Sequence, residues 1–293
     1  MNNKYIRQTF DFLLFSNLFI ALCAVAQGLL TYHLLHAKPD KYVLGMLLCS
    51  TIAMYNYSML LSKPANPEKS AFRRVRWIFA HYRLTITITI IAILSLIPLA
   101  LFLSTESKML LAFLALLSVG YNLPVFTFND KKFGLRNIPG IKLFLIATVW
   151  SLSCVLLPVL EFESYHTVVV SARDIVLLVA KRFLFIAAIT VPFDIRDLFQ
   201  DRHNELKTIP VILGEKKAYL FCMTLLFIYV ILLFLFTQSF NPNFFGLLFT
   251  IILTSWLIFR SEWERNEYFY FFYLDGVMIV QYVVLLVLNS IYQ

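Results

Sequence analysis

The sequence predicts an all-α, polytopic membrane protein in which nine transmembrane helices form one domain over residues 1–293. Two observations support this fold class. Of the 293 residues, 60% are hydrophobic and only 14% are charged, a larger apolar share than a soluble globular domain requires. The apolar residues also fall into nine separate runs, most of them close to the roughly 20 residues that a helix needs to cross a bilayer.

The expected spans follow one another with short polar connections. They lie at 12–35, 42–61, 84–103, 109–126, 141–160, 175–193, 218–236, 244–259 and 268–291. The first span follows Lys4 and Arg7, and the small residues at 24–26 resemble a signal-peptide cleavage site. The apolar run continues beyond that point to Leu35, which favours a retained first helix over a cleaved signal peptide.

Cationic residues are distributed unevenly over the connections. Those at 62–83, 127–140, 194–217 and 260–267 carry most of the Lys and Arg outside the spans, whereas the alternate connections keep only Lys38, Lys41, Lys108 and Arg173. The positive-inside rule therefore predicts a cytoplasmic N-terminus in an integral membrane protein, and we expect a bacterial inner membrane. The two longest cytoplasmic connections lie four spans apart, which indicates two four-helix halves plus a ninth helix.

Three carboxylates stand out at the end of the sixth span. Asp194, Asp197 and Asp201 are spaced three and four residues apart, which places them on one face of a helix. Carboxylate oxygens are the ligands that Mg²⁺ prefers. The cluster predicts a Mg²⁺ site that holds a polyanionic ligand at the membrane surface, although acids in a connection are often simply solvated.

The residues that follow these acids carry a resemblance. Asp197 and Asp201 precede the run Lys-Thr-Ile-Pro-Val at 207–211 and then Leu213-Gly214. This pattern resembles the second aspartate-rich motif of the UbiA family of intramembrane aromatic prenyltransferases. The nine-span layout also resembles that family, as does the segment 121–124 with the basic residues after it.

The resemblance implies a function and its partners. A UbiA-like protein would transfer a prenyl group from a polyprenyl diphosphate to an aromatic or other lipophilic acceptor, with Mg²⁺ as cofactor and an active site facing the cytoplasm. The expected partners are these two substrates and the lipid bilayer, with no nucleic acid.

The first aspartate-rich motif departs from the family pattern. Asn56 is in place, but Tyr57, Leu60 and Pro64 occupy the positions where the family has acids, and Glu68 is the nearest acid. The sequence is therefore similar to a divergent member with a degenerate first motif. The alternative function is a UbiA-like protein that binds a prenyl diphosphate or an anionic lipid without turnover.

The resemblance and the residue types together define the expected site. Asp197, Asp201 and Tyr121 are the expected catalytic residues, and Asp194, Asp197 and Asp201 are the expected metal ligands. Substrate binding is expected from a mainly basic set: Asn56, Glu68, Arg73, Arg74, Arg76, Lys131, Lys132, Arg196 and Lys207. The basic run at 73–76 suits either a diphosphate clamp or an anchor on anionic headgroups.

The sequence also carries charges inside a span, and two other classes of membrane protein have to be compared with it. Lys181 and Arg182 fall within the sixth span, where the alternatives are an ion pair with Asp275, a role facing the substrate, or snorkelling to the interface. A transporter would more typically carry Gly- and Pro-interrupted helices at the midplane. A CDP-alcohol phosphotransferase would continue Asp275-Gly276 with a different signature than Val277-Met278.

Overall fold

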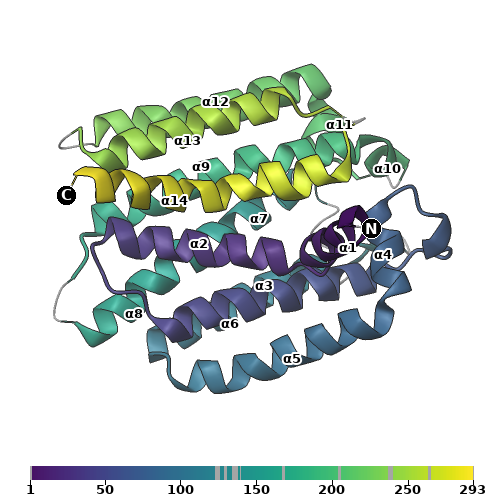
Figure 1. The fold of residues 1–293 in the computed structure, drawn as a ribbon, viewed down its shortest axis with the longest axis horizontal. Coiled ribbons are helices and arrows are strands. Elements are labelled where there is room, and N and C mark those ends of the chain that lie inside the picture. Colours follow the sequence, from purple (N-terminus) through teal and green to yellow (C-terminus); the bar gives the residue numbers. More distant parts are fainter. Residues whose placement is uncertain are drawn as a thin grey trace.

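The computed structural model describes residues 2–122, 126–128, 131–133, 138, 140–166, 169–203, 206–236, 240–262 and 265–292. Its long helices run side by side in a bundle (Figure 1). The first half contains α1 (Asn2–Phe15), α2 (Leu18–Leu34), α3 (Lys41–Leu61), α5 (Tyr82–Leu101) and α6 (Thr105–Asn122). The start of α3 is fixed by Asp40, whose Oδ1 accepts hydrogen bonds from the backbone N–H groups of Tyr42 and Val43 at 2.7 and 2.9 Å.

The second half contains longer helices. It begins with α7 (Ile141–Ser151), a π-helical turn η3 (Leu152–Leu156) and α8 (Leu157–Tyr165), which together form one span. Then follow α9 (Ala172–Arg196), α12 (Glu215–Leu235), α13 (Pro242–Phe259), the π-helical turn η4 (Phe269–Leu274) and α14 (Asp275–Tyr292). Ser171 caps α9 and Asn241 caps α13, each by accepting a backbone N–H bond three residues on.

The first expected span differs from the prediction. Residues 12–35 do not form one helix, because α1 and α2 meet at an angle of 59°. The break falls at Asn17, whose φ of 67° is in the left-handed region. Asn is one of the few residues that adopts this conformation at low cost, and its side chain is buried in contacts described below. The expectation of a continuous first helix is therefore wrong.

The described residues contain seven or eight candidate spans. Seven helices are long and apolar enough to cross a membrane, or eight if the bent pair α1–α2 counts as one span. Helix α6 covers most of the expected span at 109–126 but is not among the seven. The spans alone identify an integral membrane protein, and the exact count of nine is not confirmed.

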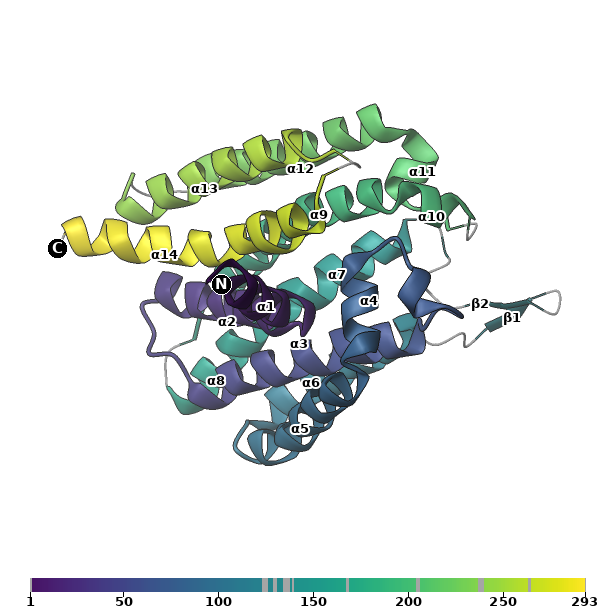
Figure 2. The same ribbon diagram turned by 45° about the vertical axis from the view of Figure 1, so that its right-hand side comes forward.

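Connections with polar residues gather at one end of the bundle. These are η1 (Pro67–Lys69), α4 (Arg73–Ala80), the hairpin of β1 (Phe126–Phe128) and β2 (Lys131–Phe133), α10 (Leu198–His203) and α11 (Ile209–Leu213). Both views place them at that end, with the hairpin projecting outward (Figure 2). The connections rich in Lys and Arg therefore lie on one side of the bundle. The predicted cytoplasmic position of all of them requires this arrangement.

Helices from both halves share a single main core. Helix α9 packs against α7 and α12, while α2 packs against α3 and α14. The core cluster joins Leu30 of α2, Leu157 of α8, Ala188 of α9, Ile258 of α13 and Leu285 of α14, all at most 1% exposed. Because α9 is buried from both sides near its C-terminal end, the acids that end it are held rigidly at the polar end of the bundle.

Candidate functional site

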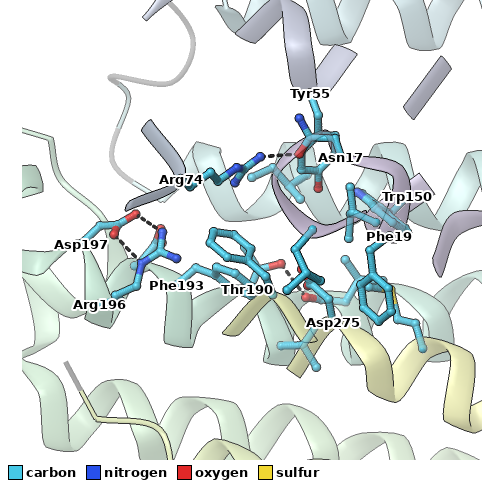
Figure 3. A pocket seen from close by; sticks show the side chains of 18 of the residues that line it. Asn17, Phe19, Tyr55, Arg74, Trp150, Thr190, Phe193, Arg196, Asp197 and Asp275 are labelled. Atoms are coloured by element: carbon cyan, nitrogen blue, oxygen red, sulfur yellow. Dashed lines mark hydrogen bonds and ion pairs between the residues drawn. The ribbon is translucent and has the colours of Figure 1, made fainter. Parts of the chain in front are cut away.

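A cavity of about 190 Å³ lies between the two halves, close to the polar end of the bundle (Figure 3). Its lining comes from the α1–α2 break, α2, α3, α4, α7, α9, η4 and α14. Six charged side chains line it: Arg74, Lys142, Asp194, Arg196, Asp197 and Asp275. The remaining lining is mostly apolar and includes Phe19, Ile20, Ile146, Trp150, Ile186, Ile189, Phe193, Phe271 and Met278.

The acidic wall is already matched by cations of the protein. Lys142 Nζ, from the first turn of α7, lies 2.5 Å from Asp194 Oδ1 and 4.0 Å from Asp201 Oδ2. Arg196 binds its neighbour Asp197 through two hydrogen bonds of 2.7 and 2.9 Å. Burial raises the pKa of Asp201 to about 6, because nearby acids reinforce the effect and Lys142 only partly offsets it.

The Mg²⁺ expectation can be tested on this geometry. Among the described residues, no three His, Cys, Asp or Glu side chains lie close enough together to hold a metal ion. Asp194 and Asp197 each have a cationic partner, and the facing motif offers Tyr57 and Leu60 instead of acids. Mg²⁺ requires several oxygen ligands in near-octahedral geometry. The residues as placed do not fit a bound Mg²⁺ ion.

The wall opposite the acids carries a buried arginine. Arg74 reaches inward from α4, and its Nη2 donates to Asn17 Oδ1 at 2.5 Å. Asn17 Nδ2 in turn donates to Asn56 Oδ1 at 2.6 Å. The α4 helix is held in place because the Glu267 carboxylate accepts the backbone N–H bonds of Arg73 and Arg74 at 2.5 and 3.0 Å. Burial lowers the pKa of Arg74, and the charge of Arg196 adds to that effect.

Both guanidinium groups retain an unused donor. Arg74 Nε and Arg196 Nη1 are buried and have no hydrogen-bond partner in the described structure. Aromatic rings surround the two groups, since Arg74 lies 4.7 Å and Arg196 5.0 Å from the centroid of Phe271. Arg196 also contacts Tyr270 at 5.3 Å. Buried unpaired donors are costly unless a ligand accepts from them, so these two N–H groups favour an anionic ligand.

The structure brings together part of the expected site. Asp194, Asp197, Arg74 and Arg196 line the cavity. Asn56 is buried behind Asn17. Two expected residues do not line the cavity but contact a residue that does: Asn56 bonds to Asn17, and Asp201 lies 4.0 Å from Lys142. Tyr121 does not line the cavity.

Other expected residues lie away from the cavity. Arg73 forms an ion pair of 2.5 Å with Asp11 and does not line the cavity. Arg76 is exposed and donates to the backbone of Ser70 and Ala71. Two further side chains, Glu68 and Lys207, are exposed. The side chains of Lys131 and Lys132, in β2, lie outside the described residues.

Three lining residues were missed or left undecided by the sequence. Lys142 is a lone cation just inside an apolar span, and Asn17 follows Ser16 as a polar pair inside another; these polar interruptions are the signal available in the sequence. An ion pair between Asp275 and Arg182 is one of the alternatives that the sequence leaves open. In the structure Asp275 lines the cavity, where the positive charges near it are those of Arg74 and Arg196. Arg182 instead donates to Gln27 and Thr31.

Comparison of whole structures identifies similar folds. No protein-family model and no curated protein sequence matches the chain. A UbiA homologue from Archaeoglobus fulgidus bound to GPP and Mg²⁺ is 12% identical, with a TM-score of 0.66 over 96% of this chain and 99% of that one. The same homologue bound to DMAPP and Mg²⁺ gives 12% identity and a TM-score of 0.64 over the same shares.

A second organism gives a similar result. The apo structure of a UbiA homologue from Aeropyrum pernix K1 is 12% identical, with a TM-score of 0.61 over 95% of this chain and 96% of that one. The similarity extends over nearly the full length of each protein, whereas the identity is too low to carry residue roles across. The chain therefore has the fold of these UbiA homologues.

Proposed function

We propose that this protein binds a prenyl diphosphate in the cavity and transfers its prenyl group to a lipophilic acceptor within the membrane. The observation that supports this best is the lining of the cavity, which combines two guanidinium groups that each have a buried, unpaired N–H with many aromatic and aliphatic side chains. A prenyl diphosphate combines an anionic group and an apolar chain in the same way. Structures of the same fold contain GPP or DMAPP, which makes this ligand class the first to test.

The diphosphate group would bind between the two walls. Arg74 Nε and Arg196 Nη1 are free to donate to phosphate oxygens, and a planar guanidinium suits phosphate geometry. Lys142, held against Asp194, adds a third positive charge to the same lining. In the orientation predicted from the positive charges, this part of the cavity faces the cytoplasm, from which a water-soluble diphosphate would enter.

The apolar part would hold the prenyl chain. Transfer breaks the bond between the allylic carbon and the diphosphate oxygen, and the electron pair leaves with the diphosphate. Side chains that stabilise the departing charge lower the barrier to this step, which assigns that role to Arg74 and Arg196. The rings of Phe193, Phe271 and Trp150 line the cavity where the allylic cation would form, and aromatic faces stabilise cations. The acceptor then forms the new bond and releases a proton.

The resemblance also implies that the reaction depends on Mg²⁺. Because the described residues do not fit a bound Mg²⁺ ion, no step is assigned to one. The same observation favours a second candidate function, in which the site binds a prenyl diphosphate or another anionic lipid without turnover. The two candidates share the cavity and differ only in whether the carbon–oxygen bond is broken.

Diphosphate release separates the two candidates. Purified protein in nanodiscs would receive geranyl diphosphate (GPP) or farnesyl diphosphate, with membrane lipid extract as a source of acceptors, in Mg²⁺ and in EDTA. Release above the rate of an Arg74→Gln/Arg196→Gln double variant, which lacks both guanidinium groups, supports transfer. Tight binding with no release in either condition supports the binding function. Absence of both binding and release for every donor would contradict the proposal.

A further inference from the structure

A second, smaller cavity lies deep in the bundle and is distinct from the first. Its volume is about 20 Å³, and its lining includes Lys181, Arg182, Tyr229 and Gln281 among apolar residues. Arg182 is ten residues from the first residue of α9, which places it about 15 Å along the helix and near the middle of a hydrocarbon core about 30 Å thick. A charge at this depth requires an explanation.

The polar groups around this cavity form a chain that ends in a donor. Arg182 donates to Gln27 Oε1 and, at 3.3 Å, to Thr31 Oγ1. Gln27 Nε2 donates to the Met278 carbonyl at 2.8 Å and to Gln281 Oε1 at 3.3 Å. Gln281 Nε2 is buried, on a residue only 1% exposed, and makes no hydrogen bond of normal geometry; the Tyr229 hydroxyl is the acceptor beside it. Since Gln281 Oε1 is already an acceptor, the chain ends in an N–H donor.

No carboxylate offsets the charge at this position. The cavity lining contains no Asp or Glu. The ionisable groups that act on Arg182 are the neutral thiol of Cys154 and the neutral phenol of Tyr229. Lys181 interacts with Asp174, but that acid is exposed in the first turn of α9 and is capped by Ser171. Among the described residues, Lys181 thus has a distant, exposed acid, whereas no acid acts on Arg182.

We propose that this cavity binds one small inorganic anion of the halide class, with chloride as the physiological ligand. The cavity has room for a single water-sized species, which excludes a diphosphate or a lipid headgroup. A water molecule would accept two hydrogen bonds but would leave the positive charge of Arg182 uncompensated. Chloride would accept the hydrogen bonds and also neutralise that charge. The anion would join α9 to α14 through Arg182 and Gln281. This inference does not depend on the proposed function.

Thermal unfolding of the purified full chain tests the anion. Tm would be followed as sodium isethionate, whose anion is too large for the cavity, is replaced by sodium chloride at constant ionic strength. We expect Tm to rise and then saturate with chloride. The Gln281→Met and Arg182→Gln variants should lose this rise, while the matched control Arg173→Gln, which removes an exposed cation of the same helix, should keep it. Equal Tm values in the two salts for the wild type would overturn the proposal.

A crystallographic measurement on the wild type avoids any effect of substitution on folding. Crystals grown in sodium bromide would be measured at the bromine absorption edge. An anomalous peak between Arg182, Lys181 and Gln281 is the expected result. A bromide-grown crystal with ordered protein and no anomalous peak in this cavity would overturn the proposal.

Discussion

Arg74 is the side chain on which the proposed ligand site depends most. It lines the cavity from the wall where the expected acids are missing, and its buried Nε has no partner. A hydrogen bond between a charged donor and a phosphate oxygen contributes about 1.5–3 kcal/mol, which corresponds to a factor of roughly 10 to 150 in Kd. We therefore expect Arg74→Gln to weaken GPP binding by that factor.

The neighbouring arginine supplies a matched control. Arg73 has the same charge, but it is paired with Asp11 at 2.5 Å and stacked over Tyr268 at 5.2 Å, away from the cavity. Arg73→Gln should change the Kd for GPP by less than about twofold, because the Arg73 side chain does not line the cavity. Both variants would be compared by titration calorimetry in nanodiscs, with Tm as a check on folding. Equal Kd values for wild type and Arg74→Gln, at unchanged Tm, would refute the assignment.

Three further predictions concern the same cavity. Lys142→Met should lower the free energy of unfolding by about 3–5 kcal/mol, because it leaves the buried Asp194 carboxylate without its cation; chemical denaturation would measure this, and adding Asp194→Asn should recover most of the loss. Removing divalent cations with EDTA should raise the Kd for GPP by less than about tenfold, or about 1.4 kcal/mol, because no three metal-ligating side chains are clustered among the described residues; a larger loss in calorimetry would show that a metal is required. Ile189→Trp should fill part of the apolar wall and weaken GPP binding while leaving inorganic diphosphate binding unchanged, and a parallel loss for both ligands in competition assays would contradict the division of the cavity.

Sequence patterns predicted the features that depend on neighbouring residues. The long apolar runs correspond to α3, α5, α9, α12 and α13 within a few residues. The three- and four-residue spacing predicted one face for the three acids; Asp194 and Asp197 line the cavity at the end of α9, whereas Asp201, in α10, does not. These successes reflect helical periodicity and bilayer thickness, which act locally along the chain.

Contacts between distant segments could not be predicted in the same way. The break at Asn17 is stabilised by bonds to Asn56 and Arg74, which are 39 and 57 positions away. Lys142 meets Asp194 across 52 positions. Arg182 binds neutral side chains of α2 instead of Asp275, because the packing of α2 against α14 places Gln27 beside it.

The central claim is that the main cavity binds a prenyl diphosphate, and photolabelling tests it most directly. A GPP analogue with a photoreactive group on its prenyl chain would be cross-linked to the protein in nanodiscs, and the labelled peptides would be identified by mass spectrometry. We expect labelling of α7, α9 and α14 near Trp150, Ile189 and Met278, and we expect excess GPP to prevent it. Labelling confined to the lipid-facing α5, or labelling that excess GPP does not reduce, would contradict the account.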